Sequence, residues 1–237
     1  MTDRSLLRLG AACGILSVVL EFVGLGIAAV SSPGLVDSTL ATSEGEIARA
    51  FSSPATAGVW VGLYLQVVAF LLFVVFAARL WATLRRAEGG AGWVSNVVLG
   101  AGVLFAGITL LALAFWGMAD YQAGPSVNVE VAMVLNVLHI GTYNLSWAAQ
   151  ALFLAAAAVV VLRTRALPGW LGWSAAGISV GSLAGVAVPT GSLAEIPAFL
   201  FLIWVVAVSI VLMRRTDEVS PAPARTREHA PRAATLR

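Results

Sequence analysis

One acidic residue inside a long apolar run has the clearest capacity for chemistry in this chain. Glu21 lies within the run from Gly10 to Val30, about 11 residues or ~16 Å of helix from its start. A charge near the middle of a bilayer costs ~3 kcal/mol on the insertion scale, so such residues usually face protein and mark function. Two interpretations stay open: a proton-carrying carboxyl group, or a neutral acid that hydrogen-bonds a neighbouring helix.

Polar side chains recur at spacings of three or four residues along a later run: Asn136, His139, Tyr143, Ser146 and Gln150. This spacing places them on one face of a helix. Helical rise puts Gln150 and Ser182 ~18 Å from the arginine-bearing ends of their runs, level with Glu21, and puts Gln66 slightly farther at ~22 Å. His139 lies ~34 Å from the same end, so we expect no direct contact with Glu21.

We therefore expect a polar vestibule that opens outward, with Asn136 and His139 at its mouth and Glu21 at its floor. The candidates for binding a ligand or a proton are Glu21, Gln66, Tyr143, Ser146, Gln150 and Ser182. The alternative is a seam between helices in which these polar groups bond one another. An interfacial histidine such as His139 is more often hydrated and structural than catalytic.

Sequence signatures of enzymes and cofactor sites are not found. The chain has no P-loop, no G-x-G-x-x-G turn, no H-E-x-x-H and no G-x-S-x-G motif. One of its two histidines, His229, lies in the polar tail, which disfavours bis-histidine haem ligation. The single cysteine, Cys13, excludes an intramolecular disulfide and a cysteine metal site. We predict no catalytic residue, no metal and no cofactor.

The elements that must position these residues are six apolar runs: Gly10–Val30, Ala57–Trp81, Val94–Met118, Thr142–Leu162, Trp170–Pro189 and Ile196–Met213. A helix needs roughly 20 apolar residues to cross a hydrocarbon layer of ~30 Å, and each run approaches or exceeds that length. Hydrophobic residues make up 59% of the chain and charged residues 11%, which leaves no room for a separate soluble domain. The predicted fold is all-α, an integral membrane bundle of six transmembrane helices over residues 1–213. A disordered basic tail, 214–237, follows it.

Arginine positions predict the orientation of the bundle. The chain has no lysine, and 13 of its 14 arginines fall on one side of the six spans, with Arg49 alone on the other. By the positive-inside rule both termini are cytoplasmic, in a bacterial plasma membrane. The pI near 9.2 thus reflects the placement of arginines at the ends of the spans. The expected partner is the lipid bilayer, and we expect no nucleic-acid partner. A cleaved signal peptide is the competing interpretation of the first run, although that run is longer than a signal h-region.

Between the first two spans, residues 43–51 have the pattern of a short amphipathic helix. Ser43 and Glu46 form a predicted capping box, and Ile47 and Phe51 follow at helical spacing. We expect this helix to lie on the outer membrane surface.

Small residues indicate how the helices meet. Gly177, Gly181 and Gly185 form a repeated G-x-x-x-G ridge, which lets two backbones approach closely where lipid removes the hydrophobic drive. Packing within the bundle is one use of this ridge, and a homodimer interface is the other. Four tryptophans lie near predicted span ends, as in an aromatic belt: Trp60, Trp93, Trp116 and Trp170.

The segment Arg165-Ala166-Leu167-Pro168-Gly169-Trp170-Leu171-Gly172-Trp173 resembles the turn that opens the fifth helix in one bacterial family. With six spans, an acidic outer loop that carries a short helix, and a histidine in the fourth helix, the chain from Leu6 to Met213 resembles domain-of-unknown-function family 4386. The resemblance implies the six-span fold. It implies no established activity and supplies no catalytic residues. The composition, with arginine as the only strong base and abundant alanine and glycine, resembles that of a high-GC actinobacterium.

Three classes of function stay open. The first is non-enzymatic binding of a lipophilic small molecule or a partner protein within the bundle. The second is proton-coupled transport of a small solute through Glu21. If the six spans are divided into two halves of three, the two halves begin on opposite sides of the membrane, as the inverted repeats of transporters do. The two halves share no visible sequence similarity. The third is an intramembrane lipid-modifying enzyme, for which a single acid at depth lacks an evident partner base.

Overall fold

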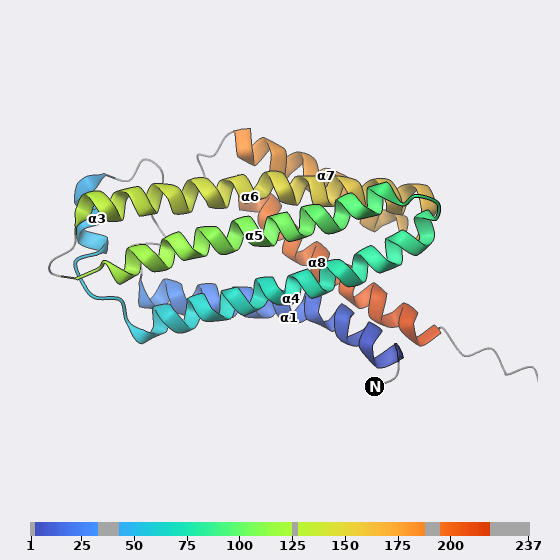
Figure 1. The fold of residues 1–237 in the computed structure, drawn as a ribbon, viewed down its shortest axis with the longest axis horizontal. Helices are drawn as coiled ribbons and strands as arrows, with labels where there is room; N and C mark the ends of the chain where they lie inside the picture. The colour runs from blue at the N-terminus through green and yellow to red at the C-terminus, as the bar shows by residue number, and fades with distance from the viewer. Residues whose placement is uncertain (1–2, 33–42, 125–127, 188–194, 219–237) are drawn as a thin grey trace, which may run out of the picture.

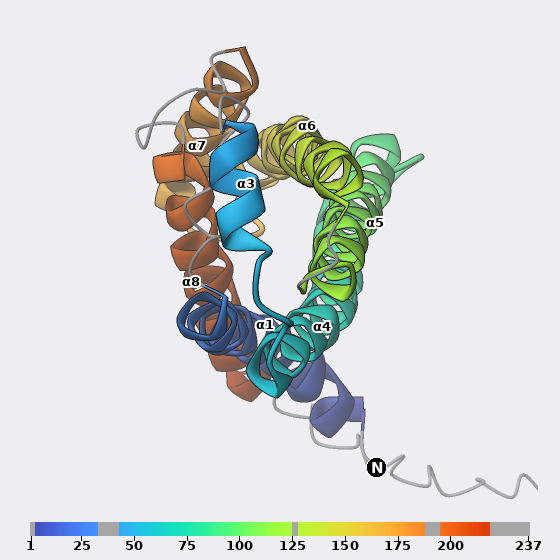
Figure 2. The same ribbon diagram turned by 90° about the vertical axis from the view of Figure 1, so that its left-hand side faces the viewer.

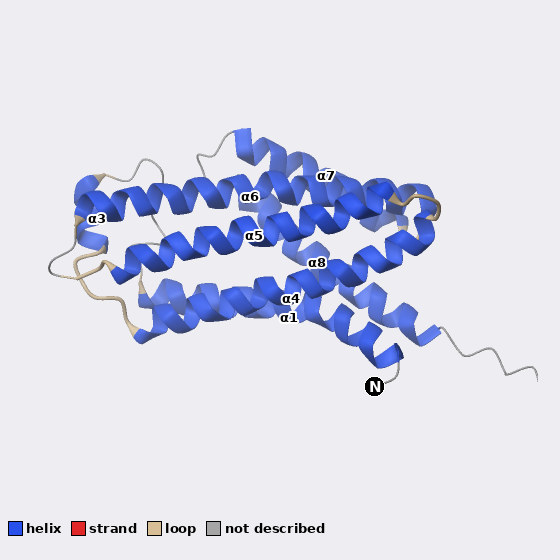
Figure 3. Cartoon of the chain, viewed as in Figure 1, coloured by secondary structure: helices blue, strands red, loops and turns tan. Residues whose placement is uncertain are grey.

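The computed structural model describes residues 3–32, 43–124, 128–187 and 195–218. Within these ranges the regular structure is helical and contains no strand (Figure 3). The helices are α1 (Asp3–Ser31), α3 (Glu44–Ala50), α4 (Ala57–Glu88), α5 (Trp93–Tyr121), α6 (Val129–Thr164), α7 (Gly169–Ala187) and α8 (Ile196–Glu218). Six of them are long and apolar enough to cross a membrane, with spans of 19 to 36 residues. The predicted all-α bundle of six membrane-spanning helices is confirmed, and the chain is an integral membrane protein.

Several helices extend beyond the apolar runs that predict them. α4 continues past Trp81 to Glu88, and α6 begins at Val129, well before the apolar run at Thr142. At 1.5 Å per residue α6 is ~54 Å long, far more than a hydrocarbon layer requires. An apolar run marks what hydrocarbon can cover, whereas helical hydrogen bonding continues until a turn residue ends it. For α4 that residue is Gly89, which has a φ of 64°.

The C-terminal boundary differs from the prediction in the same way. α8 continues through Arg214 to Glu218, so the segment expected to be a disordered tail begins as helix. Residues 219–237 lie outside the described residues, and so does Pro189, the predicted end of the fifth span.

The six long helices close into a ring. Contacts join α1 to α4, α4 to α5, α5 to α6, α6 to α7, α7 to α8, and α8 back to α1. Figure 2, seen from one end of the bundle, shows this ring with the short α3 lying across part of it. Short connections make neighbours in sequence neighbours in space, and the contact between α1 and α8 completes the circle.

The two ends of the ring differ in charge. Arginine pairs occupy the last turns of α4, α6 and α8 and the turn that follows α6: Arg85, Arg86, Arg163, Arg165, Arg214 and Arg215. These turns all lie at the same end of the bundle, here called the arginine end (Figure 1). The opposite end carries α3 and is called the α3 end. The grouping is the one that the arginine count predicts.

Phenylalanine rings fill the centre of the bundle. The ring of Phe73 on α4 lies 5.4 Å from Phe105 on α5, 5.7 Å from Phe153 on α6 and 5.8 Å from Phe201 on α8. The interplanar angles of 60° to 76° are those of edge-to-face pairs, which add about 0.5–1.5 kcal/mol each beyond burial. Four helices of the ring are thus joined through one aromatic cluster, with Trp204 of α8 at its edge against Phe153.

Glycines set the separation of α1 and α4. A Cβ added to Gly24 would lie 2.7 Å from the carbonyl oxygen of Gly62, and one added to Gly62 would lie 2.6 Å from the carbonyl oxygen of Gly24. Gly24 also lies against Gln66, and Gly14 lies against Phe76. These contacts fix an antiparallel register in which only glycine allows the two backbones to approach so closely.

The predicted short helix between the first two spans forms as α3. The carboxylate of Glu46 accepts hydrogen bonds from the backbone N–H and the hydroxyl of Ser43, both at 2.8 Å, which lowers the pKa of this carboxyl group. Ile47 and Phe51 are each 1% exposed because they pack into the protein core. α3 thus packs its apolar face on the protein and covers the end of the bundle, in contact with α6. Its place at the outer surface of the membrane stays a prediction.

The glycine ridge of α7 has two kinds of neighbour. A Cβ at Gly181 would lie 3.0 Å from Pro197 of α8, whereas a Cβ at Gly177 would meet nothing within 4 Å. Gly181 therefore serves packing within the bundle. Gly177 leaves space on the outer side of α7, and a homodimer through Gly177, Gly181 and Gly185 stays a prediction.

The glycine contact between α1 and α4 leads to a matched pair of substitutions on one helix. Gly24→Ala forces a methyl group into the Gly62 backbone, and we expect a loss of about 1–3 kcal/mol in the free energy of unfolding. Gly26→Ala adds a methyl group where nothing lies within 4 Å, so its stability should stay level or rise by up to about 1 kcal/mol. Thermal unfolding in detergent measures both, and equal losses would contradict the register of α1 on α4.

Candidate functional site

Five buried polar atoms have no hydrogen-bond partner among the described residues: Glu21 Oε2, Gln66 Nε2, Trp116 Nε1, Asp120 Oδ2 and Trp147 Nε1. They belong to α1, α4, α5 and α6. Buried polar groups are nearly always bonded, and leaving one unbonded costs about 1–3 kcal/mol. Together with His139 and Tyr143, which connect them, these residues are called the polar cluster below.

Glu21 and Gln66 are brought to adjoining turns by the contact of α1 with α4. The backbone of Gly24 lies against the side chain and backbone of Gln66, and Glu21 precedes Gly24 by one turn on the same side of α1. Gln66 is 2% exposed, and Glu21 is half-buried with its Oε2 covered. The two residues form the part of the polar cluster nearest the phenylalanine rings.

Aromatic side chains of α5 and α6 continue the polar cluster toward the α3 end. The ring of His139 lies 5.5 Å from Trp116 and 6.3 Å from Tyr143, and Tyr143 lies 5.9 Å from Trp147. Nδ1 of His139 is 2.9 Å from the carbonyl oxygen of Ala112. A carbonyl only accepts, so Nδ1 carries the proton and Nε2 of the neutral ring is left to accept.

Trp116 occupies a different environment from the other tryptophans near span ends. Its side chain is 4% exposed, whereas Trp60, Trp93 and Trp170 are 41% to 68% exposed, as residues of an aromatic belt are. The interpretation of Trp116 as a belt residue is therefore wrong. It points into the bundle, where the ring of His139 from α6 packs against it.

Tyr143 connects the aromatic side chains to Glu21. It lies within electrostatic range of the carboxyl groups of Glu21 and Glu195. Its side chain is 37% exposed, although Asn136 and Trp147, on the same face of α6, are 4% exposed or less. Tyr143 is therefore more exposed than these two neighbours on that face.

Asp120 adds a second buried carboxylate, which sequence reasoning missed as a site residue. It is 3% exposed, and its Oδ1 accepts a hydrogen bond of 3.4 Å from the hydroxyl of Ser32. An acid in the last turn of a helix is usually a solvated charge, so its position in α5 did not indicate a buried site residue. The available signal was its spacing of four residues from Trp116, which places both on one helix face.

Three other predicted site residues follow the seam interpretation. Gln150 of α6 donates a hydrogen bond of 2.9 Å to the hydroxyl of Ser182 on α7, and both side chains are 1% exposed. The hydroxyl of Ser182 donates in turn to its own helix at 2.9 Å. Ser146 donates to the backbone carbonyl of Tyr143 at 2.6 Å. These groups are bonded within the bundle, unlike Glu21 Oε2 and Gln66 Nε2.

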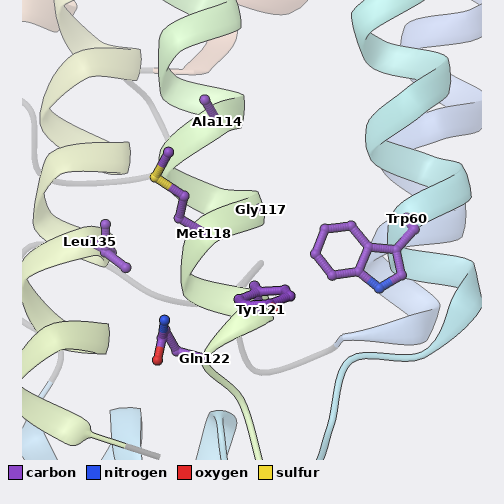
Figure 4. A pocket seen from close by; sticks show the side chains of 7 residues that line it. All are labelled: Trp60, Ala114, Gly117, Met118, Tyr121, Gln122 and Leu135. Carbon is purple, nitrogen blue, oxygen red and sulfur yellow. The ribbon is translucent and has the colours of Figure 1, made fainter.

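A groove of about 430 Å³ lies on the other side of α5 (Figure 4). It is lined by Trp60, Ala114, Gly117, Met118, Tyr121, Gln122 and Leu135. Its α5 residues lie on the face opposite Trp116 and Asp120, so α5 separates the groove from the polar cluster. The lining is mostly apolar and aromatic, which suits a lipid chain more than a polar solute.

Within the polar cluster the indole N–H of Trp116 lies at the carboxyl group of Asp120, and that of Trp147 lies at the phenol of Tyr143. Glu21 Oε2 and Gln66 Nε2 are left as an acceptor and a donor without partners among the described residues, beside an imidazole and a phenol. Such a set can bind a molecule that is largely apolar and carries a few polar groups. It can also relay protons between carboxyl, imidazole and phenol groups. Among the described residues, no group of three or more histidine, cysteine, aspartate or glutamate side chains could hold a metal ion.

The two buried glutamines provide a test of this division between cluster and seam. Gln66→Leu removes an unbonded amide, so the ligand-free protein should gain about 1 kcal/mol in the free energy of unfolding. Gln150→Leu breaks the bond to Ser182 and should lose about 1 kcal/mol. Unfolding by sodium dodecyl sulfate in mixed micelles measures both. A loss for Gln66→Leu as large as that for Gln150→Leu would mean that the Gln66 amide is bonded.

No family model, no curated protein and no solved structure matches the chain. Functional assignment of the polar cluster therefore rests on the chemistry of its own side chains.

Proposed function

We propose that the protein binds a lipophilic small molecule, without catalysis, at the polar cluster inside the α3 half of its bundle. The observation that carries this proposal is that Glu21 Oε2 and Gln66 Nε2, buried on adjoining turns of α1 and α4, have no partner among the described residues. A fold that leaves such groups unbonded loses stability, and natural sequences retain such a loss where function needs it. A bound molecule with an apolar body and a few polar groups would supply the missing bonds.

The burial of the polar cluster favours a small molecule over a partner protein. Gln66, Trp116, Asp120 and Trp147 are 4% exposed or less, so the surface of another protein cannot reach them. α3 covers this end of the bundle through Ile47. A ligand that enters from lipid or past α3 fits this geometry better.

The membrane setting of the site follows from charge. We propose that the arginine end faces the cytoplasm of a bacterial cell, because cytoplasmic ends of membrane helices carry the excess of arginine. Both termini are then cytoplasmic, the localisation is the plasma membrane, and α3 and Asp120 lie on the outer side. Membership of family 4386 stays a prediction.

Proton-coupled transport is the second candidate, and one observation favours it. Titratable groups follow one another from Asp120 through His139 and Tyr143 to Glu21, linked at the outer end by Trp116. Chains of acids and histidines inside a membrane are typical of proton relays. An intramembrane lipid-modifying enzyme, the third alternative, gains no observation of this kind.

Ligand binding can be tested by native mass spectrometry of the protein released from lipid nanodiscs. We expect a bound lipophilic molecule on the wild type. Loss of one hydrogen bond in Gln66→Leu or Trp147→Phe should weaken its retention roughly twofold to tenfold. Ser209→Ala is the control, because the Ser209 hydroxyl donates to its own helix at 2.8 Å and is not part of the polar cluster. Wild-type protein that carries no molecule under any lipid condition would contradict the proposal.

Transport can be tested in proteoliposomes that contain a trapped pH-sensitive dye. With an imposed potential, the wild type should admit protons faster than protein-free liposomes, and more so when the co-purifying molecule is added. Glu21→Gln removes the group at the inner end of the series, so it should reduce this flux to the protein-free level. The exposed acid Glu130 provides the control Glu130→Gln, which should behave as wild type. Equal flux through both variants would exclude a role for Glu21 in transport.

A further inference from the structure

The buried carboxyl groups of the polar cluster have no cation beside them among the described residues. Glu21 Oε2 has no hydrogen-bond partner there, whereas the carboxyl group of Asp120 interacts with Ser32 and Trp116. Arg49 lies at the α3 end, but it is exposed and its Nε donates to the backbone carbonyl of Gly45 at 3.2 Å. The other described arginines lie toward the arginine end. A carboxylate removed from water needs a cation or strong donors to offset its desolvation.

Aromatic rings lie in the same part of the bundle. Trp116, His139, Tyr143 and Trp147 follow one another at ring separations of 5.5 to 6.3 Å. The face of a tryptophan or tyrosine ring attracts a cation within ~6 Å, and more strongly where water is excluded. A carboxylate beside aromatic rings is the usual chemistry for recognising an organic ammonium group.

The region of the bundle next to the polar cluster, on the side of the arginine end, is apolar. Along α4, the contacts of Gly24 with Gln66 and of Gly14 with Phe76 bracket the level of Glu21. Phe70 and Phe73 lie in that interval, and both pack on Phe105 of α5. A ligand whose charge meets Glu21 therefore has phenylalanine rings within reach of its apolar part.

We infer that the polar cluster binds an organic cation with an apolar body, with its charge at Glu21 and against the rings of Tyr143 and Trp147. This inference rests on the proposed function and specifies its ligand class. The unbonded Nε2 of Gln66 provides a place for an acceptor oxygen on the same molecule. On α5, Asp120 lies four residues beyond Trp116, ~6 Å nearer the α3 end, where it attracts the cation during entry.

A neutral lipophilic molecule would fit the rings and the donors but would leave the carboxylate of Glu21 without a counter-charge. The two ligand classes therefore differ in their dependence on the charge at position 21. They can be compared with two compounds of related shape, the cation tetraphenylphosphonium and the neutral triphenylphosphine oxide.

Equilibrium dialysis of the full-length protein in neutral detergent measures the binding of both compounds. We expect wild type to bind tetraphenylphosphonium, and Glu21→Gln to bind it roughly tenfold or more weakly, with little change for triphenylphosphine oxide. Glu21→Asp keeps the charge and should keep the preference for the cation. Glu130→Gln, which removes an exposed acid, should match wild type. Thermal unfolding of each variant confirms that it is folded.

The outcomes separate this inference from the proposed function. Equal binding of both compounds by wild type and Glu21→Gln would overturn the cation inference and leave a lipophile site in place. Binding of neither compound by wild type would also overturn it, and the mass-spectrometric test would then decide the proposed function alone. Cation binding that Glu21→Gln leaves intact but Asp120→Asn abolishes would overturn the assignment of the charge to Glu21.

Discussion

The aromatic cluster around Phe73 is the contact on which the rest of the bundle depends. It joins α4, α5, α6 and α8 near the middle of their lengths, and it replaces the hydrophobic drive that lipid does not supply between helices. With these four helices fixed, the ring can tolerate a poorly bonded region toward the α3 end. Stability and binding capacity are thus placed in different halves of one bundle. The half near the arginines is packed, and the half near α3 carries unbonded polar groups.

The close approach of α1 and α4 decides where the unbonded groups meet. Gly24 and Gly62 let the two backbones touch, which carries Glu21 and Gln66 to adjoining turns inside the ring. A larger residue at either glycine would separate the helices and turn the carboxyl group toward lipid. The position of Glu21 inside the ring therefore depends on two glycines as well as on its own place in the sequence.

The sequence predicts the six spans, the grouping of arginines at one end and the capping interaction of Ser43 with Glu46, and the structure has all of these. The spans and the cap depend on local chemistry: length in hydrocarbon, or a side chain that caps a helix. The burial of Trp116 and Asp120 and the docking of α3 could not be predicted in this way. Lipid-facing and protein-facing residues of a membrane helix are both apolar, so composition does not encode which way a helix is rotated.

The helices of this ring also differ in how they match a bilayer. α7 has 19 residues, or ~28 Å of helix, close to the ~30 Å thickness of hydrocarbon, whereas α6 is nearly twice as long. A thicker membrane can cover more of α6 at little cost, but it strains α7 by drawing its ends into hydrocarbon. That strain acts where Gln150 donates to Ser182 and Ser179 donates to the carbonyl oxygen of Ala151, two hydrogen bonds between these helices. Membranes of different thickness would therefore open or tighten this corner of the ring, and lipid composition becomes a variable that adjusts the protein's shape.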